Sequence, residues 1–360
     1  MQNPPWESRL LDIAGADNVE QLKSVREKEQ QRLESELESA SSPDAAVVKL
    51  NDLHDILIAR ALKLAEDDMA RSGRGAPPVP YAYMLYGSGG RREQTLHSDQ
   101  DSGIVYADAD NEKEQESNRE YFLELAGKAV ELLIAIGYPP CEGNVISSNP
   151  EWCMPLEGWG RKIDHWFNEP SWENVRYLLI ATDGRPVWGD FGLAERLSGR
   201  FFGDLNGHPV IARRMMENTL RHKVLVGVFG QLLTERYGED AGSLDIKYGA
   251  YIPMVNAFRL LAVRAGIRET STLSRIEALR REGLIAEEEA KEASEAFSLF
   301  LKLRMLSSVT TENGHLVGTG KIPSSKLTKD IVASLKKALK TGGKIQRKVQ
   351  KELQDRFGGR

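Results

Sequence analysis

The segment from Leu85 to Asp108 reads LYGSGGRREQTLHSDQDSGIVYAD, and the interpretation of the whole chain depends on it. An apolar run stops at Gly-Ser-Gly-Gly, and two arginines follow. Two aspartates separated by one residue then precede a second apolar run. A phosphate site, a metal site and an ordinary loop with solvated acids each account for part of this pattern. The choice among them depends on what the turn, the arginines and the aspartates can do together.

The turn and the arginines have the chemistry of a phosphate site. Glycine at position 87 lets the backbone approach a ligand closely, and amide groups at the start of a following helix favour an anion. The Ser88 hydroxyl can donate to a phosphate oxygen, and Arg91 and Arg92 each offer a planar fork of donors. Gly87, Ser88, Arg91 and Arg92 are therefore candidate nucleotide-binding residues.

The paired aspartates indicate a cation. On an extended segment, residues 99 and 101 project to the same side, and two carboxylates so placed repel each other unless a cation lies between them. Magnesium prefers oxygen ligands and shares them with phosphates. A lone Asp-x-Asp is more often a loop with solvated acids. Between a glycine turn and a strand, Asp99 and Asp101 instead predict a magnesium and nucleoside triphosphate site.

Two other phosphate-binding patterns do not fit this segment. The Walker A pattern requires Lys followed by Ser or Thr after its last glycine, where this chain has Arg91 and Arg92. The dinucleotide-binding G-x-G-x-x-G pattern requires a third glycine at the position of Arg92. Neither a P-loop nor a dinucleotide fold is therefore expected.

Composition indicates a globular protein with one unusually basic segment. The chain has 360 residues, 41% of them hydrophobic and 28% charged, with a net charge of −5. Residues Lys321 to Arg360 include 12 Lys and Arg but only 3 Asp and Glu. Such a segment is more often a solvated helix face, and contact with a polyanion such as a nucleic acid is the alternative.

Cysteine usage and hydropathy indicate in which cellular compartment the protein is expected. The two cysteines, Cys141 and Cys153, form neither a disulfide framework nor a zinc-binding spacing. The opening residues MQNPPWESRL lack the basic-then-apolar pattern of a signal peptide, and no apolar run approaches the roughly 18 residues that span a bilayer. We expect a cytoplasmic protein that does not enter a membrane.

The pattern of residues in the first half of the chain changes near residue 75. Residues 1–75 are expected to form a helical hairpin, with helices at about 19–39 and 42–69, and a Gly- and Pro-rich segment follows. Residues 80–198 then alternate between strand and helix signals, which predicts an α/β or α+β domain. The expected strands are YAYMLYG, SGIVYA, GNVIS and RYLLIATD, and a helix is expected to end near Gly137.

The second half reads as helical. Strand signals vanish beyond about Gly203, so residues 203–355 are predicted to form an all-α domain. Helical patterns run over residues 210–238, 252–267, 272–284 and 287–306. Thr270 and Ser271 precede the third of these and are candidate helix caps.

The motif segment also resembles a known family. GSGGRREQTLHSDQDSGIVY resembles the motif of the DNA polymerase β-like nucleotidyltransferases, in which Gly-Ser is followed by Asp-x-Asp on the next strand. It is more similar still to the DUF294 nucleotidyltransferases, which are related to the N-terminal domain of the bacterial PII uridylyltransferase. Their form G-S-x-G-R-x-E-Q-T-L-x-S-D-Q-D is nearly intact here, and the similarity extends over roughly residues 50–350.

The resemblance implies an α+β domain with a mixed sheet flanked by helices, and it implies roles for the motif residues. Gly87 and Ser88 would hold the β- and γ-phosphates of a nucleotide, and Asp99 and Asp101 would bind two magnesium ions. A third carboxylate from a later strand would complete the metal site. Asp183, at the end of RYLLIATD, is the best candidate, and Asp164 and Asp190 are the alternatives.

The resemblance also implies an activity. It is the magnesium-dependent transfer of a nucleoside monophosphate from a triphosphate to a hydroxyl, with a PII-type protein as one candidate acceptor. The alternative is a nucleotide-binding sensor or regulatory protein without turnover. Self-association of the helical domain into a homo-oligomer is compatible with either.

Overall fold

The computed structural model describes residues 5–39, 44–207, 240–312 and 314–357, together with residues 211, 214–215, 217, 225, 231–235 and 237–238. The chain divides into two compact units. The first unit combines Met1–Ile163, Asp183–Phe201 and Thr311–Val317, and the second combines Asp164–Thr182, Phe202–Thr310 and Gly318–Arg360. The segment 1–75, expected as a separate hairpin, lies in the first unit together with the sheet.

A four-stranded mixed sheet forms the centre of the first unit. Its strands are β1 (Tyr81–Leu85), β2 (Ser102–Tyr106), β3 (Cys153–Pro155) and β4 (Arg185–Gly189). Their order is β3-β2-β1-β4, with β1 antiparallel to β2 and β4, and β2 parallel to β3. The expected α+β class, the strands YAYML and SGIVY, and the mixed sheet with flanking helices are confirmed.

The register of the sheet explains where the sequence motifs meet. Leu85, the last residue of β1, lies opposite Ser102, the first residue of β2, and also opposite Arg185, the first residue of β4. Residues that follow β1 therefore lie at the same end of the sheet as residues that precede β2 and β4. The Gly-Ser turn, the aspartate pair and Asp183 are brought to this end of the sheet by pairing alone.

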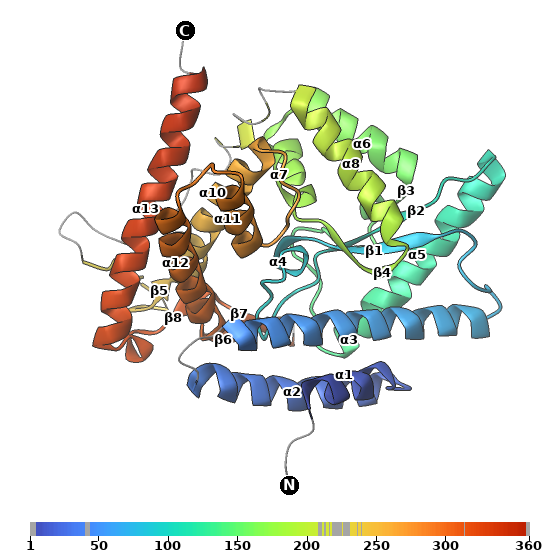
Figure 1. The fold of residues 1–360 in the computed structure, drawn as a ribbon. Helices are drawn as coiled ribbons and strands as arrows, with labels where there is room; N and C mark the ends of the chain where they lie inside the picture. The colour runs from blue at the N-terminus through green and yellow to red at the C-terminus, as the bar shows by residue number, and fades with distance from the viewer. Residues whose placement is uncertain are drawn as a thin grey trace. The chain divides into compact units, whose positions relative to one another are not determined.

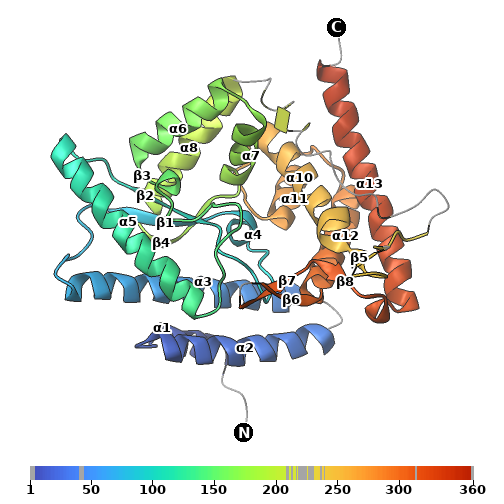
Figure 2. The same cartoon turned by 180° about the vertical axis from the view of Figure 1, so that it is seen from behind.

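Helices cover both faces of this sheet (Figures 1 and 2). The helices α3 (Asp44–Arg71) and α5 (Glu112–Ala135) cover one face, and α1 (Trp6–Ala14) and α2 (Val19–Ser39) pack against α3. The first parts of α6 (Leu156–Asn168) and α8 (Phe191–Gly207) cover the other face. Tyr106 of β2 stacks on Phe122 of α5, and Trp159 of α6 donates to the Ile104 carbonyl at 2.9 Å. Aromatic packing on both faces thus holds β2 in place.

The second unit is mostly helical. Its helices are α7 (Trp172–Ala181), α10 (Ile252–Arg264), α11 (Thr272–Arg281), α12 (Glu287–Met305) and α13 (Lys329–Phe357), with the helical turn η2 (Lys247–Tyr251). Tyr251 and Phe297 stack in its core. The Ser271 hydroxyl accepts from the Ser274 amide, which confirms Ser271 as the cap of α11. None of the helices that the structure describes is long and apolar enough to cross a bilayer.

Two expected strands in the first half are wrong. RYLLIATD forms most of α7 instead, because Ser171 caps the helix at its start and Val175, Leu178 and Leu179 bury one helical face. An apolar run of this length fits a buried strand or a buried helix equally well, so periodicity alone misassigned it. The neighbouring strand is RPVWG, whose proline is tolerated because β4 is an edge strand. GNVIS lies in a loop, although its Val145 carbonyl accepts from the Ser102 amide.

The expected absence of strands beyond Gly203 is also wrong. Two short antiparallel pairings are present, one between β5 (Leu244–Asp245) and β8 (Lys321–Ile322), and one between β6 (Val309–Glu312) and β7 (His315–Gly318). They have two to four residues each, and β6 is exposed along its length, so no apolar alternation marks them. The helix expected over residues 210–238 falls largely outside the described residues.

A buried histidine ties α3 to the motif segment. His54 is fully buried, with Nδ1 2.7 Å from the Tyr138 hydroxyl and Nε2 3.1 Å from the Thr95 carbonyl. A carbonyl only accepts, so Nε2 carries the proton and Nδ1 of the neutral ring accepts from tyrosine. Burial, together with the charge of Arg26, lowers the pKa of His54 to about 3. The neutral ring is therefore the form that stabilises the fold.

This histidine makes stability depend on pH in a defined direction. The unfolded chain takes up a proton at His54 below about pH 6.5, whereas the folded chain does so only near pH 3. Its contribution should be present above about pH 6.5 and should fall by about 1.4 kcal/mol per pH unit below that. Urea unfolding of the wild type and of His54→Gln at pH 7, 6 and 5 measures this contribution. The difference in unfolding free energy between them should shrink with acidification, and a constant difference would contradict the assignment.

Candidate active site

The Gly-Ser-Gly-Gly turn forms the short helix α4 (Gly87–Gly90) directly after β1. Gly87 has φ of 52°, and a Cβ atom at this position would overlap the Oδ2 atom of Asp101. A Cβ atom at Gly90 would overlap the backbone oxygen of Asp183. These two glycines therefore allow the turn to touch both acid-bearing segments at once. Gly89 meets only ordinary contacts, chiefly with Leu85.

The turn also presents polar donors. The Gly90 amide donates to the Tyr86 carbonyl at 2.8 Å and closes the first helical turn. The amides of Gly87, Ser88 and Gly89 precede that hydrogen bond, so the helix itself supplies no acceptor for them. The Ser88 side chain makes no hydrogen bond with any residue that the structure describes. The three amides and the hydroxyl are the type of donor set that binds phosphate oxygens.

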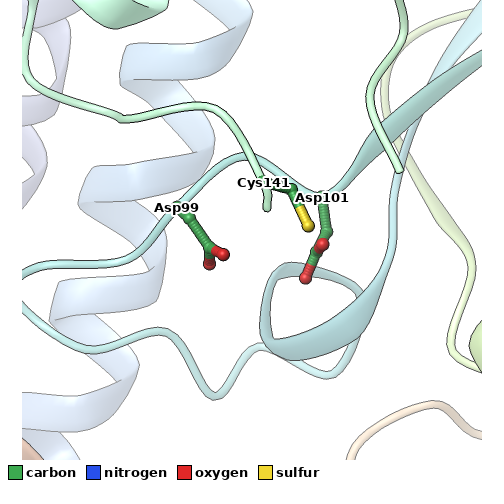
Figure 3. Close-up of side chains that lie close together, drawn as sticks. All are labelled: Asp99, Asp101 and Cys141. Carbon is green, nitrogen blue, oxygen red and sulfur yellow. The ribbon is translucent and has the colours of Figure 1, made fainter. Parts of the chain in front are cut away.

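The aspartate pair gathers with a cysteine that lies forty residues later in the chain. One carboxylate oxygen each of Asp99 and Asp101 and the Cys141 Sγ atom all lie within 4.8 Å of one another. Figure 3 shows the three side chains projecting toward the same space. The main chain brings them together, because Gln100 forms a parallel bridge with Pro140 and its amide donates to the Pro139 carbonyl at 2.9 Å. The pairing of Asp99 and Asp101 in space agrees with the expectation from their i, i+2 spacing.

The cysteine in this cluster is protonated at neutral pH. Burial raises the pKa of the Cys141 thiol well above its ordinary value, and the charge of Asp101, a hydrogen bond with Asp101 and the charge of Asp99 raise it further. The Gly143 amide, which donates to Sγ at 3.3 Å, acts in the opposite direction. In the absence of a cation, the thiol thus serves as a hydrogen-bond donor between two carboxylates.

A small pocket beside the aspartates has both apolar and polar residues in its wall. Gly89, Gln94, Asp99, Gln100 and Asp101 contribute to its wall. Gln94 and Gln100 are buried, and their Oε1 atoms have no hydrogen-bond partner among the described residues. The two carboxylates fit a magnesium ion, which prefers oxygen ligands and retains several of its waters. The thiol of Cys141 does not belong to such a ligand set.

Asp183, expected as the third carboxylate, lies at the same end of the sheet but outside this cluster. It is fully buried in the turn between α7 and β4, and its Oδ2 atom accepts from Arg91 Nη1 at 2.5 Å. Arg91 also donates from Nε to Glu93 at 2.7 Å. The guanidinium of Arg91 is thus buried between two carboxylates beneath the turn, and it connects the motif segment to the approach of β4.

The two alternatives to Asp183 have other positions. The Asp190 carboxylate accepts from the Gly192 amide at 2.9 Å, at the start of α8, and the residue is exposed. Asp164 belongs to the second unit of the fold. Neither lies in the cluster of Asp99, Asp101 and Cys141, which is the one group of its kind found among the described residues.

Arg92 and Arg185 are held by acids from α3. Arg92 donates to Asp52 and, at 2.5 Å, to Asp55, and Arg185 donates to Asp55 at 2.5 Å. Arg92 has φ of 55°, a conformation that is unfavourable for an arginine, and its side chain stays 39% exposed. The ion pairs with α3 hold the residue in that conformation. Arg92 is thus the more accessible of the two arginines expected to bind phosphate.

Sequence reasoning missed Cys141, Asp52 and Asp55. Cys141 fits neither a disulfide framework nor a zinc spacing, and its distance along the chain from the aspartates gives no indication that they meet. Asp52 and Asp55 look like ordinary acids on the polar face of a long helix. Only the packing of α3 against the end of the sheet reveals that they bind the arginines of the motif.

Two protein-family models match the chain. The model described as "Putative nucleotidyltransferase DUF294" matches residues 28–173, and the model described as "Putative nucleotidyltransferase substrate binding domain" matches residues 209–353. The first range includes the Gly-Ser turn, the aspartate pair and Cys141, whereas Asp183 falls between the two ranges. No curated protein matches the chain.

The three glycines of the turn should respond differently to alanine. Gly87→Ala introduces a left-handed alanine that clashes with Asp101, and Gly90→Ala clashes with the backbone at Asp183, so each should lower the unfolding free energy by at least about 1–2 kcal/mol. Gly89→Ala is the matched control, because its Cβ meets only ordinary contacts, and it should be within about 0.5 kcal/mol of the wild type. Thermal and urea unfolding measure the three variants. Equal losses at all three positions would contradict the close approaches.

Proposed function

The chain belongs to the DUF294 nucleotidyltransferase family, and on that basis we propose that it transfers a nucleoside monophosphate from a nucleoside triphosphate to a hydroxyl acceptor with the help of magnesium. The observation that carries the proposal is the contact between the Asp101 carboxylate and the Gly87 turn. It brings cation ligands and phosphate donors to one place. A site that bound phosphate alone would not need two acids there.

Some residues around the turn would bind the cation, and others would bind the nucleotide. Asp99 and Asp101 would hold magnesium through their carboxylates. The amides at residues 87–89 and the Ser88 hydroxyl would donate to the outer phosphates of the triphosphate. Arg92 would add charge from its exposed position, whereas Arg91 would act by holding Asp183 and Glu93 in place.

Magnesium bound at two sites would lower the pKa of the acceptor hydroxyl and neutralise the charge of the leaving pyrophosphate. The chain's own contribution is positioning, which accounts for most of the rate in reactions of this type. Gly87 lets the phosphates approach the carboxylates closely, and the ion pairs of Arg91 keep the turn and β4 at a fixed separation. We retain Asp183 as the proposed third carboxylate, in which case its side chain would bind both Arg91 and a cation.

We propose that the acceptor is a protein, as PII uridylylation would require, and that the surface of this protein is acidic. The support is the exposed face of α13, which lies within the range of the substrate-binding family model. Seven basic side chains on this helix are exposed: Lys329, Lys336, Lys337, Lys340, Lys344, Arg347 and Lys351. At 3.6 residues per turn they fall within an arc of about 100°, so they form one stripe along the helix. We call these seven residues the basic stripe.

Loss of either aspartate should abolish transfer. Purified protein is incubated with each of four α-labelled nucleoside triphosphates, magnesium and a cell extract, and the labelled acceptors are counted. Asp99→Asn and Asp101→Asn should each lower transfer at least about 100-fold, because metal binding contributes several kcal/mol to such reactions. Asp110→Asn is the matched control, since Asp110 is an exposed acid just beyond β2 and should leave transfer unchanged.

The same assay separates the alternatives. Label that persists in both aspartate variants would contradict the metal site. Binding of a triphosphate without transfer from any of the four would favour a nucleotide sensor. Asp183→Asn distinguishes two roles for that residue: a metal ligand should raise the magnesium concentration needed for half-maximal transfer, whereas a residue that only holds Arg91 should lower stability and leave that concentration unchanged.

Charge reversal on the basic stripe should weaken acceptor use. The variant Lys336→Glu/Lys340→Glu/Arg347→Glu should lower labelling of the acceptor at least about 10-fold, and added salt should weaken labelling by the wild type. Lys291→Glu on α12 is the matched control, an exposed lysine outside the stripe. Digestion of the labelled product with protease or with nuclease identifies the acceptor. Nuclease-sensitive label would replace the proposed protein acceptor with a nucleic acid.

A further inference from the structure

We propose that Cys141 determines which metals the aspartate pair can bind. Thiophilic divalent cations such as Zn²⁺ and Cd²⁺ would take Asp99, Asp101 and the Cys141 sulfur as three ligands, whereas Mg²⁺ would take the carboxylates alone. This inference rests on the proposed function in placing a divalent cation at the aspartate pair. It adds that a second class of cation competes for that position and displaces magnesium.

The geometry allows one ion to reach all three side chains. The two carboxylate oxygens and the Cys141 Sγ atom lie within 4.8 Å of one another. Ligand atoms at about 2.0–2.3 Å from a tetrahedral zinc ion lie about 3.3–3.8 Å apart, so the three side chains would move toward one another by about 1 Å on binding. The pairing of Gln100 with Pro140 fixes the two segments at this separation. Figure 3 shows the sulfur and the carboxylates directed into the same space.

The chemistry of the donors gives the selectivity. Magnesium is a hard cation that prefers oxygen, while thiolate sulfur binds zinc and other soft or borderline cations tightly. When such a cation binds, the S–H bond breaks, a sulfur–metal bond forms and the proton passes to water. Two carboxylates and one thiolate outweigh the +2 charge of the ion. The cluster therefore keeps a net negative charge after the ion binds. Any further ligands of the ion are expected to be neutral, as water is, or positively charged.

Two polar side chains lie in the wall of the pocket next to the aspartates. Gln94 and Gln100 are buried, and their Oε1 atoms have no hydrogen-bond partner among the described residues. Buried carbonyl oxygens without partners are costly. The pocket therefore favours a polar occupant such as water over an apolar one.

The competing interpretation gives Cys141 a purely local role. Its thiol forms a hydrogen bond with Asp101, and that hydrogen bond could orient the carboxylate for magnesium and do nothing else. Serine can also donate a hydrogen bond to a carboxylate, but it does not form a metal–thiolate bond. The substitution Cys141→Ser therefore separates the two roles.

The experiment titrates the metal-free full-length protein with CdCl2 and follows the near-ultraviolet absorption of cadmium–thiolate bonds. Equilibrium dialysis measures the affinity in parallel. The chain has two cysteines, so Cys153→Ser, which alters the buried cysteine of β3, is the matched control. The wild type and Cys153→Ser should show the absorption at one equivalent of cadmium. Cys141→Ser should lack it and bind cadmium at least 10-fold more weakly.

Two further arms test the other ligands. Asp99→Asn/Asp101→Asn should keep both thiols but weaken cadmium binding at least 10-fold, and MgCl2 should lower the apparent cadmium affinity of the wild type. An unchanged cadmium affinity in Cys141→Ser, or a wild-type cadmium affinity that does not change with magnesium, would overturn the proposal. Cys141→Ala serves as a second variant, and thermal unfolding of each variant establishes that it is folded.

The outcome is independent of the transfer reaction. Cadmium absorption that requires Cys141, together with no nucleotidyl transfer, would uphold this inference and refute the proposed activity. Magnesium-dependent transfer without any cadmium–thiolate signal would refute this inference and uphold the activity.

Discussion

The close approach of the Asp101 carboxylate to the Gly87 backbone is the constraint on which the rest of the site depends. Any side chain at position 87 would occupy the space of that carboxylate, and the positive φ of Gly87 is what bends the chain away from β1 at this point. Antiparallel pairing of Leu85 with Ser102 supplies the remaining restraint, because it fixes where the chain leaves β1 and where it enters β2. The proposed phosphate donors and the proposed cation ligands are thus neighbours as a consequence of sheet register.

Buried ion pairs extend this constraint to the rest of the unit. Arg91 lies between Glu93 and Asp183, all three nearly inaccessible, and replacing one partner would leave an uncompensated buried charge. Such pairs contribute little net stability, but they specify a unique arrangement when every member is paired. Here the arrangement joins the motif segment to the approach of β4, and Asp55 of α3 binds Arg92 and Arg185 in a similar way. Ion pairs therefore connect the residues after the turn to the approach of β4 through Arg91 and to α3 through Arg92.

Local signals in the sequence predicted the elements that carry local chemistry. The strands on either side of the motif, the long helices α2, α3 and α12, and the same-side placement of Asp99 and Asp101 all follow from spacing within about thirty residues. RYLLIATD was misassigned because its short apolar run, YLLIA, fits a helix or a strand, and the cap at Ser171 that decides between them lies outside the run. The partners of the arginines and the meeting of Cys141 with the aspartates could not be predicted. They arise from contacts between segments 37 to 130 residues apart, for which a single sequence holds no signal.

The presence of a thiol between two carboxylates is difficult to explain by magnesium chemistry alone. A site that served only a hard cation would place water or a third oxygen where Cys141 lies, because sulfur adds nothing to magnesium binding. The charges of the two acids oppose ionisation of the thiol, so that it stays a neutral hydrogen-bond donor to Asp101 while no cation is bound. In our proposal, the same group becomes a ligand when a soft cation arrives. On this argument, the same two aspartates would have different partners for different metals, and the cysteine would set the difference in affinity between them.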